Sequence, residues 1–399
     1  MHPHLTTFIS HFTSGQFITI SGATAQLRNG DVHYPFRQDS DFLYLTGLSV
    51  PGLVLTVSPR ANQEPGLLRP SQWQEQEVIL WREAITDLDR VWGSDKISDD
   101  QIVRISGIVD IRDIGGLEEY SPRHREERGD PENKKGIPYT DWIASQARND
   151  ETGETDWKSI IHSLRLIKTP DEIEKIKKAI SVSQEAFAHI ESILRPWMYE
   201  YEIEAEIARI FRSHHLTEAY PSIVASGPNG CVLHYTAHTR QLEEGDLVLI
   251  DAGAEYMGYA SDMTRTLVVG WVYAPRQLAV YEAVERIKKI AENTLKPGIS
   301  LTAYELIVRT AMNDELRQLG LISQDASEDE IIRLSRKYYP HRTSHFLGLD
   351  VHDVGPRDAA LVPGMILTIE PGIYITEEAI GIRIEDDYLI TEYWCERLS

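Results

Sequence analysis

The sequence contains little cysteine and no long apolar stretch. Cys231 and Cys395 are its only cysteines, too few for a disulfide framework, which fits a reducing compartment. Nowhere do about eighteen apolar residues run together, so we expect no membrane span. The first residues do not combine a basic segment with an apolar one, so neither a signal peptide nor a membrane anchor is expected. These absences favour a cytoplasmic protein.

Positive charge is also scarce. Forty Lys and Arg stand against 62 Asp and Glu, a formal net charge of -22 at pH 7. Because an acidic protein is repelled by nucleic-acid phosphates and by anionic membranes, we expect neither as a partner. The composition is otherwise that of a globular protein, with 42% hydrophobic and 26% charged residues. The length of 399 residues exceeds the size at which one core keeps growing, which predicts two domains.

The first half of the chain alternates short apolar runs with polar connections. Such runs, rich in Ile, Val, Leu and Tyr, predict the strands of a central sheet. Between Ser121 and Thr155 the sequence becomes polar and highly charged, which predicts an exposed loop or linker. We therefore expect an amino-terminal α/β domain at residues 1–156. Its predicted strands lie in QFITISG, DFLYLTGL, LVLTVSP, EVILWRE and GIVDIRD.

The second half opens with a clear helix start. Thr169 is a predicted N-cap, Pro170 stands at the first helical position, and Glu172 completes a capping box. Helices and strands then alternate in an order that predicts an α+β domain at residues 157–399, with a curved, mainly antiparallel sheet covered by helices. The further predicted helices are 199–216, 274–294 and 302–319, and the predicted strands lie in LEEGDLVLIDAG, MTRTLVVG, MILTIEPGIY and EDDYLIT.

Two aspartates lie at the ends of predicted strands in this domain. Asp251 ends an apolar run and Asp262 lies eleven residues later. This spacing predicts neighbouring strands that place both carboxylates at the same end of the sheet. Two like charges in a partly buried site repel each other, and a cation is the usual compensation. Each aspartate alone is equally compatible with a turn or a cap.

Three histidines, His341, His345 and His352, gather within one short segment. Imidazoles near neutral pH act as metal ligands, proton carriers or hydrogen-bond donors, so the cluster indicates a functional site. Satisfied surface or core histidines are the alternative. His341 and His345 are four residues apart, but the glutamate of an HExxH helix is missing, so a zincin is not supported.

Two glutamates follow apolar strand patterns. Glu370 precedes the turn signal Pro371-Gly372, and a period of two places Arg383 and Glu385 on one face of a strand. The latter two could form an exposed ion pair of little energetic value. The apolar setting favours a buried pairing in which Arg383 orients a carboxylate.

The motifs that contain these residues resemble those of a known protein family. NGCVLHYT, LVLIDAGAEYMGYASDMTRT, SHFLGLDVHDVG and GIRIEDDYLIT are similar to motifs of the pita-bread metallopeptidases, and most similar to those of aminopeptidase P. YPFRQDSDFLYLTGL resembles the amino-terminal domain that aminopeptidase P and prolidase carry. The resemblance extends over nearly the whole chain and implies a pita-bread catalytic domain at residues 157–399.

The resemblance implies a dinuclear metal site. Asp251 would be a ligand of one ion, Asp262 and Glu385 would bridge both ions, and His345 and Glu370 would complete the ligands of the second. Four carboxylates and one imidazole suit two divalent ions, most readily Mn2+, with Co2+ or Zn2+ as alternatives.

The resemblance also implies roles for residues around the metals. His234 would lie near the scissile bond and stabilise the oxyanion, and Glu370 would also shuttle a proton. His341 and His352 would contact the substrate, and Arg383 would lie beside the bridging glutamate. The family usually has a small residue where this chain has Arg342, next to His341.

The implied activity is that of a Xaa-Pro aminopeptidase, which releases the first residue when proline is second. A prolidase, acting on Xaa-Pro dipeptides, is the alternative enzyme because both share all five ligands. A metal-free pita-bread module that binds peptides or proteins is the alternative outside the enzymes. The expected partners are such peptides and further copies of the chain, in a dimer or tetramer. The amino-terminal domain would support this assembly and restrict substrate access.

Overall fold

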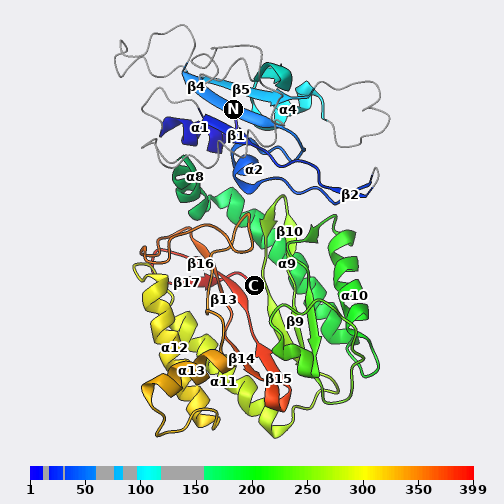
Figure 1. Cartoon of the computed structure of the whole chain (residues 1–399), viewed down its shortest axis with the longest axis vertical. Coiled ribbons are helices and arrows are strands. Elements are labelled where there is room, and N and C mark those ends of the chain that lie inside the picture. Colours follow the sequence, from blue (N-terminus) through cyan, green and yellow to red (C-terminus); the bar gives the residue numbers. More distant parts are fainter. Residues whose placement is uncertain (12–17, 30–31, 60–75, 84–96, 118–156) are drawn as a thin grey trace, which may run out of the picture. The chain divides into compact units, whose positions relative to one another are not determined.

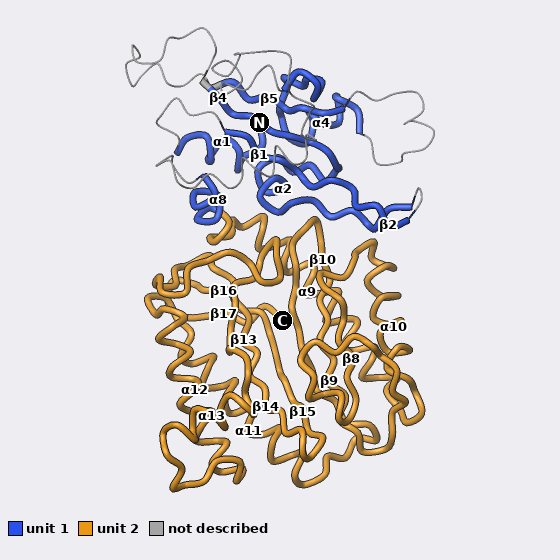
Figure 2. Tube along the Cα trace, in the orientation of Figure 1, with its two compact units in different colours: residues 1–164 blue, residues 165–399 orange. Residues whose placement is uncertain are grey.

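The structure is a computed structural model and describes residues 1–11, 18–29, 32–59, 76–83, 97–117 and 157–399 (Figure 1). It divides into two compact units, residues 1–164 and 165–399 (Figure 2). The division falls inside helix α8 (Trp157–Leu166), which begins where the sequence analysis places the domain boundary. The polar stretch between Ser121 and Thr155 lies outside the described residues.

Unit 1 contains a four-stranded sheet in the order β1-β4-β5-β6. Among the described strands of this sheet, β5 and β6 pair in parallel and the other two pairings are antiparallel. Four of the five predicted strand segments form this sheet. Its strands are β1 (Ile18–Ser21), β4 (Val54–Pro59), β5 (Gln76–Arg82) and β6 (Asp110–Asp113); around it lie α1 (Pro3–Ser10), α2 (Ser40–Thr46), α4 (Asp99–Ser106), the 3-10 turn η2 (Ile114–Gly116) and the hairpin β2 (Leu27–Asn29) and β3 (Val32–His33).

The fifth predicted strand, DFLYLTGL, is wrong, because this segment forms helix α2. The Asp39 carboxylate accepts a hydrogen bond from the Phe42 amide at 2.9 Å and caps the helix. Gly47, at φ +69°, ends it in the left-handed conformation. Phe42 and Leu45 are fully buried. A short apolar run between a cap and a glycine fits a buried helix as well as a strand, and periodicity does not separate the two.

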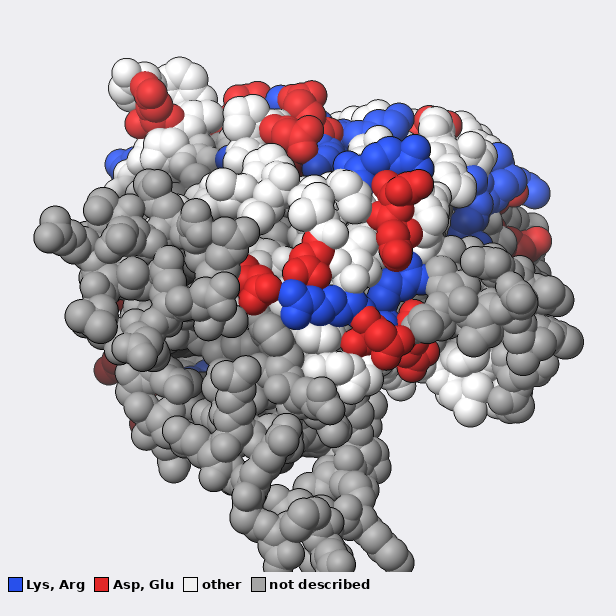
Figure 3. Space-filling view, turned by 90° about the horizontal axis from the view of Figure 1, so that it is seen from above, with Lys and Arg blue, Asp and Glu red and all other residues white. Residues whose placement is uncertain are grey.

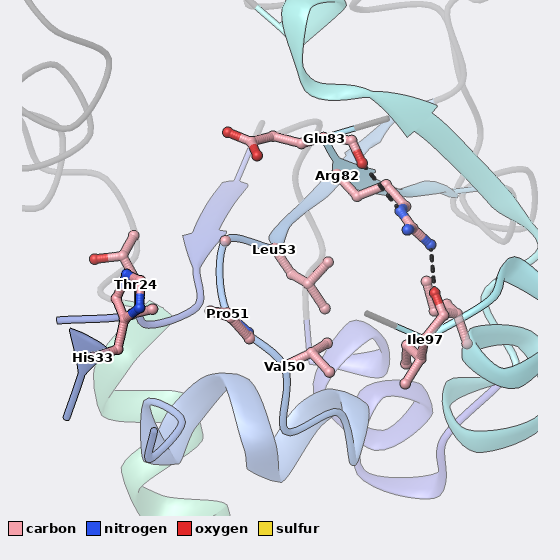
Figure 4. Close-up of a pocket in the computed structure, with 11 residues that line it drawn as sticks. Thr24, His33, Val50, Pro51, Leu53, Arg82, Glu83 and Ile97 are labelled. Atoms are coloured by element: carbon pink, nitrogen blue, oxygen red, sulfur yellow. Dashed lines mark hydrogen bonds between the residues drawn. The ribbon is translucent and has the colours of Figure 1, made fainter. Parts of the chain in front are cut away.

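Unit 1 also has an open cavity of about 490 Å³ beside β5 (Figure 4). Val50, Leu53 and Ile97 are among its lining residues. The Arg82 guanidinium, which also lines it, donates to the Ile97 carbonyl at 2.8 Å and to Asp99 at 2.9 Å. Because the hydrogen bonds of this cation are made within the protein, we assign no ligand to the cavity.

Charges of both signs lie beside one another on the described surface shown in Figure 3. Within unit 1, Arg112 bridges Glu77 at 2.9 Å and Asp110 at 2.6 Å. This cation thus lies beside two anions in the part of unit 1 that the structure describes. Among the described residues, no helix is long and apolar enough to cross a membrane.

Unit 2 contains five helices of eleven or more residues. Four of them confirm the predicted helices, and Thr169 and Glu172 form the predicted capping box, with the Thr169 amide 2.8 Å from the Glu172 carboxylate. The fifth, α13, was not predicted, although Ser327 caps it and Glu330 stands three residues later. The helices are α9 (Pro170–Ile193), α10 (Glu200–Ser213), α11 (Pro275–Thr294), α12 (Leu301–Gln318) and α13 (Glu328–Tyr338).

All described strand pairings of unit 2 are antiparallel. The strands lie between α9 and α10 on one side and α11 to α13 on the other (Figure 1). The sheets have the orders β12-β9-β8, β13-β16-β17, β11-β10-β7 and β14-β15. The strands are β7 (Thr217–Glu218), β8 (Ile223–Ser226), β9 (Leu247–Asp251), β10 (Ala254–Tyr256), β11 (Tyr259–Ala260), β12 (Thr264–Val268), β13 (Ile366–Ile369), β14 (Gly372–Ile375), β15 (Ile380–Arg383), β16 (Asp386–Ile390) and β17 (Cys395–Arg397).

Candidate metal centre and active site

Strand pairing brings three of the five predicted ligands, Asp251, Glu370 and Glu385, together. Asp251, at the end of β9, pairs with Thr264 at the start of β12. Thr264 in turn forms an isolated bridge with Glu385, between β15 and β16. Glu370 directly follows β13, whose last residue pairs with the first of β16. The backbone ladder thus lays carboxylates from β9, β13 and the β15–β16 junction side by side.

The distances show a compact group of potential ligands. Asp262, His345 and Glu385 each offer one ligand atom, and these atoms all lie within 4.8 Å of one another. His345 Nε2 lies 3.4 Å from Asp262 Oδ2 and 3.6 Å from Glu370 Oε1. Among the described residues, this is the group of His, Asp and Glu that can hold a metal ion. Hard carboxylate oxygens with one imidazole are a donor set that suits divalent transition metals.

The electrostatics of the centre fit a cation. Burial raises the pKa of Asp251, Glu370 and Glu385, and the neighbouring carboxylates raise it further. The pKa of Glu370 reaches about 7. Asp251, Asp262 and Glu385 are 9%, 5% and 1% exposed. Buried carboxylates that repel one another in this way are the setting in which metal ions are bound.

His345 is oriented for ligation. Its Nδ1 lies 3.0 Å from the Phe346 carbonyl, to which it donates, and Nε2 faces Asp262 and Glu370. Burial lowers the pKa of His345, because it disfavours the charged imidazolium. The carboxylates of Asp262 and Glu370 have the larger effect and raise this pKa to about 9. A metal ion bound at Nε2 would replace that proton.

Arg383 is buried, so it does not form the exposed ion pair with Glu385 that the sequence left open. Its Nη2 donates to Asp251 at 2.6 Å, and Nε lies 3.2 Å from Thr264 Oγ1. Thr264 donates to Glu385 Oε2 at 2.6 Å. Arg383 therefore contacts one carboxylate directly and the other through a threonine hydroxyl.

The other predicted site histidines lie around the group. His341 Nε2 lies 2.8 Å from the Tyr374 hydroxyl, and Nδ1 lies 3.7 Å from Glu370 Oε2. The His352 ring meets the His345 ring edge-on, with centroids 4.3 Å apart. Burial and the charges of Arg383, Arg309 and His234 lower the pKa of His341 to about 3, although the Arg342 carbonyl raises it. Burial also lowers the pKa of His352, and the charges of His345 and His234 contribute.

His234 and Arg342 are exposed. His234 lies in the connection from β8 to β9, close enough for its charge to act on His341 and His352. The Arg342 carbonyl lies 2.8 Å from His341 Nδ1. Because the Arg342 side chain is exposed, its size leaves the contact between His341 and Tyr374 intact.

Several residues at the centre were not predicted. The Tyr220 hydroxyl lies 2.7 Å from Asp251 and 2.5 Å from Asp262, and burial beside these carboxylates holds its pKa well above the usual range, so it remains a donor. Tyr374 links His341 to Arg383. The buried Asp387 accepts from the Asp262 amide at 3.1 Å. Tyr220 and Tyr374 act through tertiary contacts and carry no sequence signal, whereas Asp387 lies within the motif GIRIEDDYLIT that contains Glu385.

Both parts of the chain match known families. Residues 174–392 match metallopeptidase family M24, and residues 4–130 match the aminopeptidase P N-terminal domain. The Xaa-Pro aminopeptidase of Escherichia coli is 33% identical over 98% of this chain and 92% of its own length. The Xaa-Pro aminopeptidase of Haemophilus influenzae is 35% identical over 92% and 86%.

Solved structures agree with this assignment. Aminopeptidase P from E. coli, in its low-pH form, has a TM-score of 0.83 at 31% identity and covers 99% of this chain and 93% of its own. Proline aminopeptidase P II from Yersinia pestis has a TM-score of 0.84 at 31% identity, over 99% and 94%. The chain therefore has the two-domain aminopeptidase P fold, with mixed helices and mostly antiparallel sheets, and the predicted resemblance is confirmed. It belongs to the aminopeptidase P family, the Xaa-Pro aminopeptidases among the M24 metallopeptidases, and is a peptide-bond hydrolase.

Proposed function

We propose that this protein binds two divalent metal ions and releases the first residue from peptides whose second residue is proline. The observation that carries the proposal is the group of Asp262, His345 and Glu385, with ligand atoms within 4.8 Å of one another. Asp251 would complete one ion's ligands and Glu370 the other's, with Asp262 and Glu385 shared. Four ionised carboxylates carry the charge that two divalent ions balance. Mn2+ is the first candidate, with Co2+ or Zn2+ as alternatives.

The metal ions and the side chains of the protein would have different roles in the reaction. When bound, two divalent ions would polarise the scissile carbonyl and bring the pKa of a water molecule from ~15.7 to about 7. Glu370 would accept the proton of the attacking water and deliver it to the departing amine. Arg383 would hold Asp251 ionised and oriented, as its 2.6 Å hydrogen bond supports.

Histidines would act on the substrate. His234 would donate to the oxyanion that develops on the scissile carbonyl. His341 and His352 would hold the proline residue and its carbonyl. Proline has no amide hydrogen, so a peptidase that reads this N–H fails before proline. A site formed by imidazoles and metal ions needs no such donor from the substrate.

Prolidase is the competing activity, because it uses the same five ligands. The relatives named Xaa-Pro aminopeptidase, which match over nearly the whole chain, favour the aminopeptidase. The test is hydrolysis of Xaa-Pro dipeptides and Xaa-Pro-Yaa peptides, with and without chelator. Release of the first residue from the longer peptides supports the proposal, and turnover of dipeptides alone contradicts it. The metal-free binding module is not proposed, since the chain carries all five residues predicted as ligands and belongs to an enzyme family.

We further infer the setting of the enzyme. Unit 2 would be the curved, helix-covered sheet of a pita-bread domain, and the amino-terminal domain would support a dimer or tetramer that restricts access to the site. Cys231 and Cys395 are both free thiols, which supports a cytoplasmic location. Light scattering on the purified protein tests the assembly, and a monomer at working concentration would contradict it.

A further inference from the structure

We propose that Glu200 is a positioning residue for catalysis, because its buried carboxylate fixes the segment that carries His234. We define this segment, residues 227–239, as the His234 loop. The inference rests on the proposed function, in which His234 donates to the oxyanion. It assigns Glu200 a role that no motif in the sequence indicated.

The His234 loop has little regular structure of its own. It follows β8, begins with the 3-10 turn η3 (Gly227–Cys231) and continues without helix or strand up to a single bridge at Gln241. His234 is exposed within it. Among the described residues, none hydrogen-bonds to the His234 ring. The position of the imidazole therefore depends on how the backbone of the loop is held.

Glu200 accepts hydrogen bonds from the two residues that flank the His234 loop and from two side chains within it. It is the first residue of α10 and is fully buried. Its Oε1 accepts from the Ser226 amide at 2.7 Å, the Ser226 hydroxyl at 2.7 Å and Asn229 at 3.0 Å. Its Oε2 accepts from the Tyr235 hydroxyl and the Arg240 amide, both at 2.9 Å. Tyr235 is the residue next to His234.

The chemistry of the carboxylate makes this anchor strong. A buried charge is stable only when it is fully hydrogen-bonded, and hydrogen bonds to an ionised acceptor are stronger than neutral ones. Burial by itself would raise the pKa of Glu200, but the hydrogen bonds from Asn229, Ser226 and Arg240 lower it below the usual value. The group that holds the loop is therefore the ionised carboxylate.

The start of the His234 loop also packs on β15, the strand that carries Arg383. A Cβ added to Gly381 would lie 2.0 Å from the Gly230 carbonyl oxygen, so the two backbones are in direct contact. The His234 loop thus contacts both Glu200 and a strand of the metal centre. A displacement of ~1 Å at a reacting group can cost about 100-fold in rate, so partial release of the loop should be measurable.

A double-mutant cycle tests the proposal on the full-length, manganese-loaded enzyme with a Xaa-Pro-Yaa tripeptide. Tyr235→Phe removes one hydroxyl from the network, and His234→Ala removes the group to be positioned. We expect Tyr235→Phe to lower kcat about tenfold with little change in KM, because an oxyanion donor acts in the transition state. In the His234→Ala background the same change should lower kcat less than about twofold, because nothing is left to position.

Tyr259→Phe is the matched control. The Tyr259 hydroxyl donates to another buried glutamate, Glu172, at 2.8 Å, so the chemical change is the same but lies outside the His234 loop. It should lower the melting temperature as Tyr235→Phe does and leave kcat unchanged. Glu200→Gln keeps the shape but turns an amide donor toward Tyr235 or Arg240, and should lower kcat more than Tyr235→Phe does.

Two results would overturn the proposal and identify which part fails. If His234→Ala retains wild-type kcat, the role of His234 in the proposed function is wrong. The positioning role of Glu200 is then wrong as well. If His234→Ala impairs kcat but Tyr235→Phe has no effect, or has the same effect in both backgrounds, His234 keeps its role and Glu200 does not position it.

Discussion

Arg383 and Asp251, far apart in the sequence, meet in the buried centre of unit 2, where Nη2 of the arginine donates to Oδ2 of the aspartate at 2.6 Å. Their side chains are 5% and 12% exposed. Burial raises the pKa of Asp251 and Arg383 opposes this rise. The arginine therefore favours the ionised aspartate, which is the form that ligates a metal ion.

Replacing Arg383 tests this relationship. Arg383→Gln should weaken Mn2+ binding and lower kcat/KM, each by about 10- to 100-fold, as loss of a group that orients a metal ligand does. Calorimetric titration with Mn2+ and steady-state kinetics measure the two effects. Arg276→Gln is the control, because Arg276 pairs with Glu378 through two hydrogen bonds on the surface. Equal behaviour of the two variants would show that Arg383 does not support the site.

A buried ion cluster holds the segment that carries His352. Asp353, 1% exposed in its side chain, accepts from Lys168 at 3.0 Å and from Arg165 at 2.6 Å. Lys168→Met should cost about 3 kcal/mol of unfolding free energy, because it leaves a buried carboxylate short of a partner. Lys177→Met, which breaks an exposed pair with Glu174, should cost less than about 1 kcal/mol. Denaturant titration compares them, and a cost for Lys168→Met as small as that of the control would contradict the prediction.

The lowered pKa of Glu200 predicts a dependence of stability on pH. Burial raises this pKa, but hydrogen bonds from Asn229, Ser226 and Arg240 more than compensate. A carboxyl group with a folded pKa below its unfolded value of 4.5 stabilises the fold above that pH, and the stabilisation is lost as the pH falls through the folded value. The difference in unfolding free energy between wild type and Glu200→Gln should therefore be constant above about pH 5.5 and shrink below 4.5. Urea titrations from pH 7 downward measure it, and a difference that does not change with pH would contradict the prediction.

Helices and strands whose sequence pattern lies within a few consecutive residues could be predicted. The helix at Thr169 carries its start in four consecutive residues, since the capping box is a contact within one turn. The strands β9 and β12 were predicted from the apolar residues of LVLID and MTRTLVVG. Segment DFLYLTGL failed because Asp39 and Gly47, rather than its apolar run, decide between helix and strand.

The metal centre could be predicted only in part from the sequence. Asp251, His345 and Glu385 come from separate elements, and their residue types alone allow turns, caps and ion pairs. Their motifs carried the family resemblance, and the fold then showed which side chains meet. Tyr220 could not be found in this way, because it precedes its partners by 31 and 42 residues and lies in no recognisable pattern.

The role of Glu200 could not be predicted from the sequence either. A glutamate in the first turn of a helix ordinarily indicates interaction with the helix dipole. Only the fold shows that its carboxylate turns toward the His234 loop and accepts hydrogen bonds from it.

Titration of Mn2+ into chelator-treated protein, followed by release of the first residue from a Xaa-Pro-Yaa peptide, tests the central claim most directly. We predict no turnover without metal and activity that saturates at about two ions per chain, since two divalent ions balance four carboxylates. Glu385→Ala, which removes a shared ligand, should stay inactive throughout. Three results would contradict a dinuclear centre held by Asp251, Asp262, His345, Glu370 and Glu385. They are turnover in the presence of chelator, activity that saturates with a single ion per chain, and turnover by Glu385→Ala.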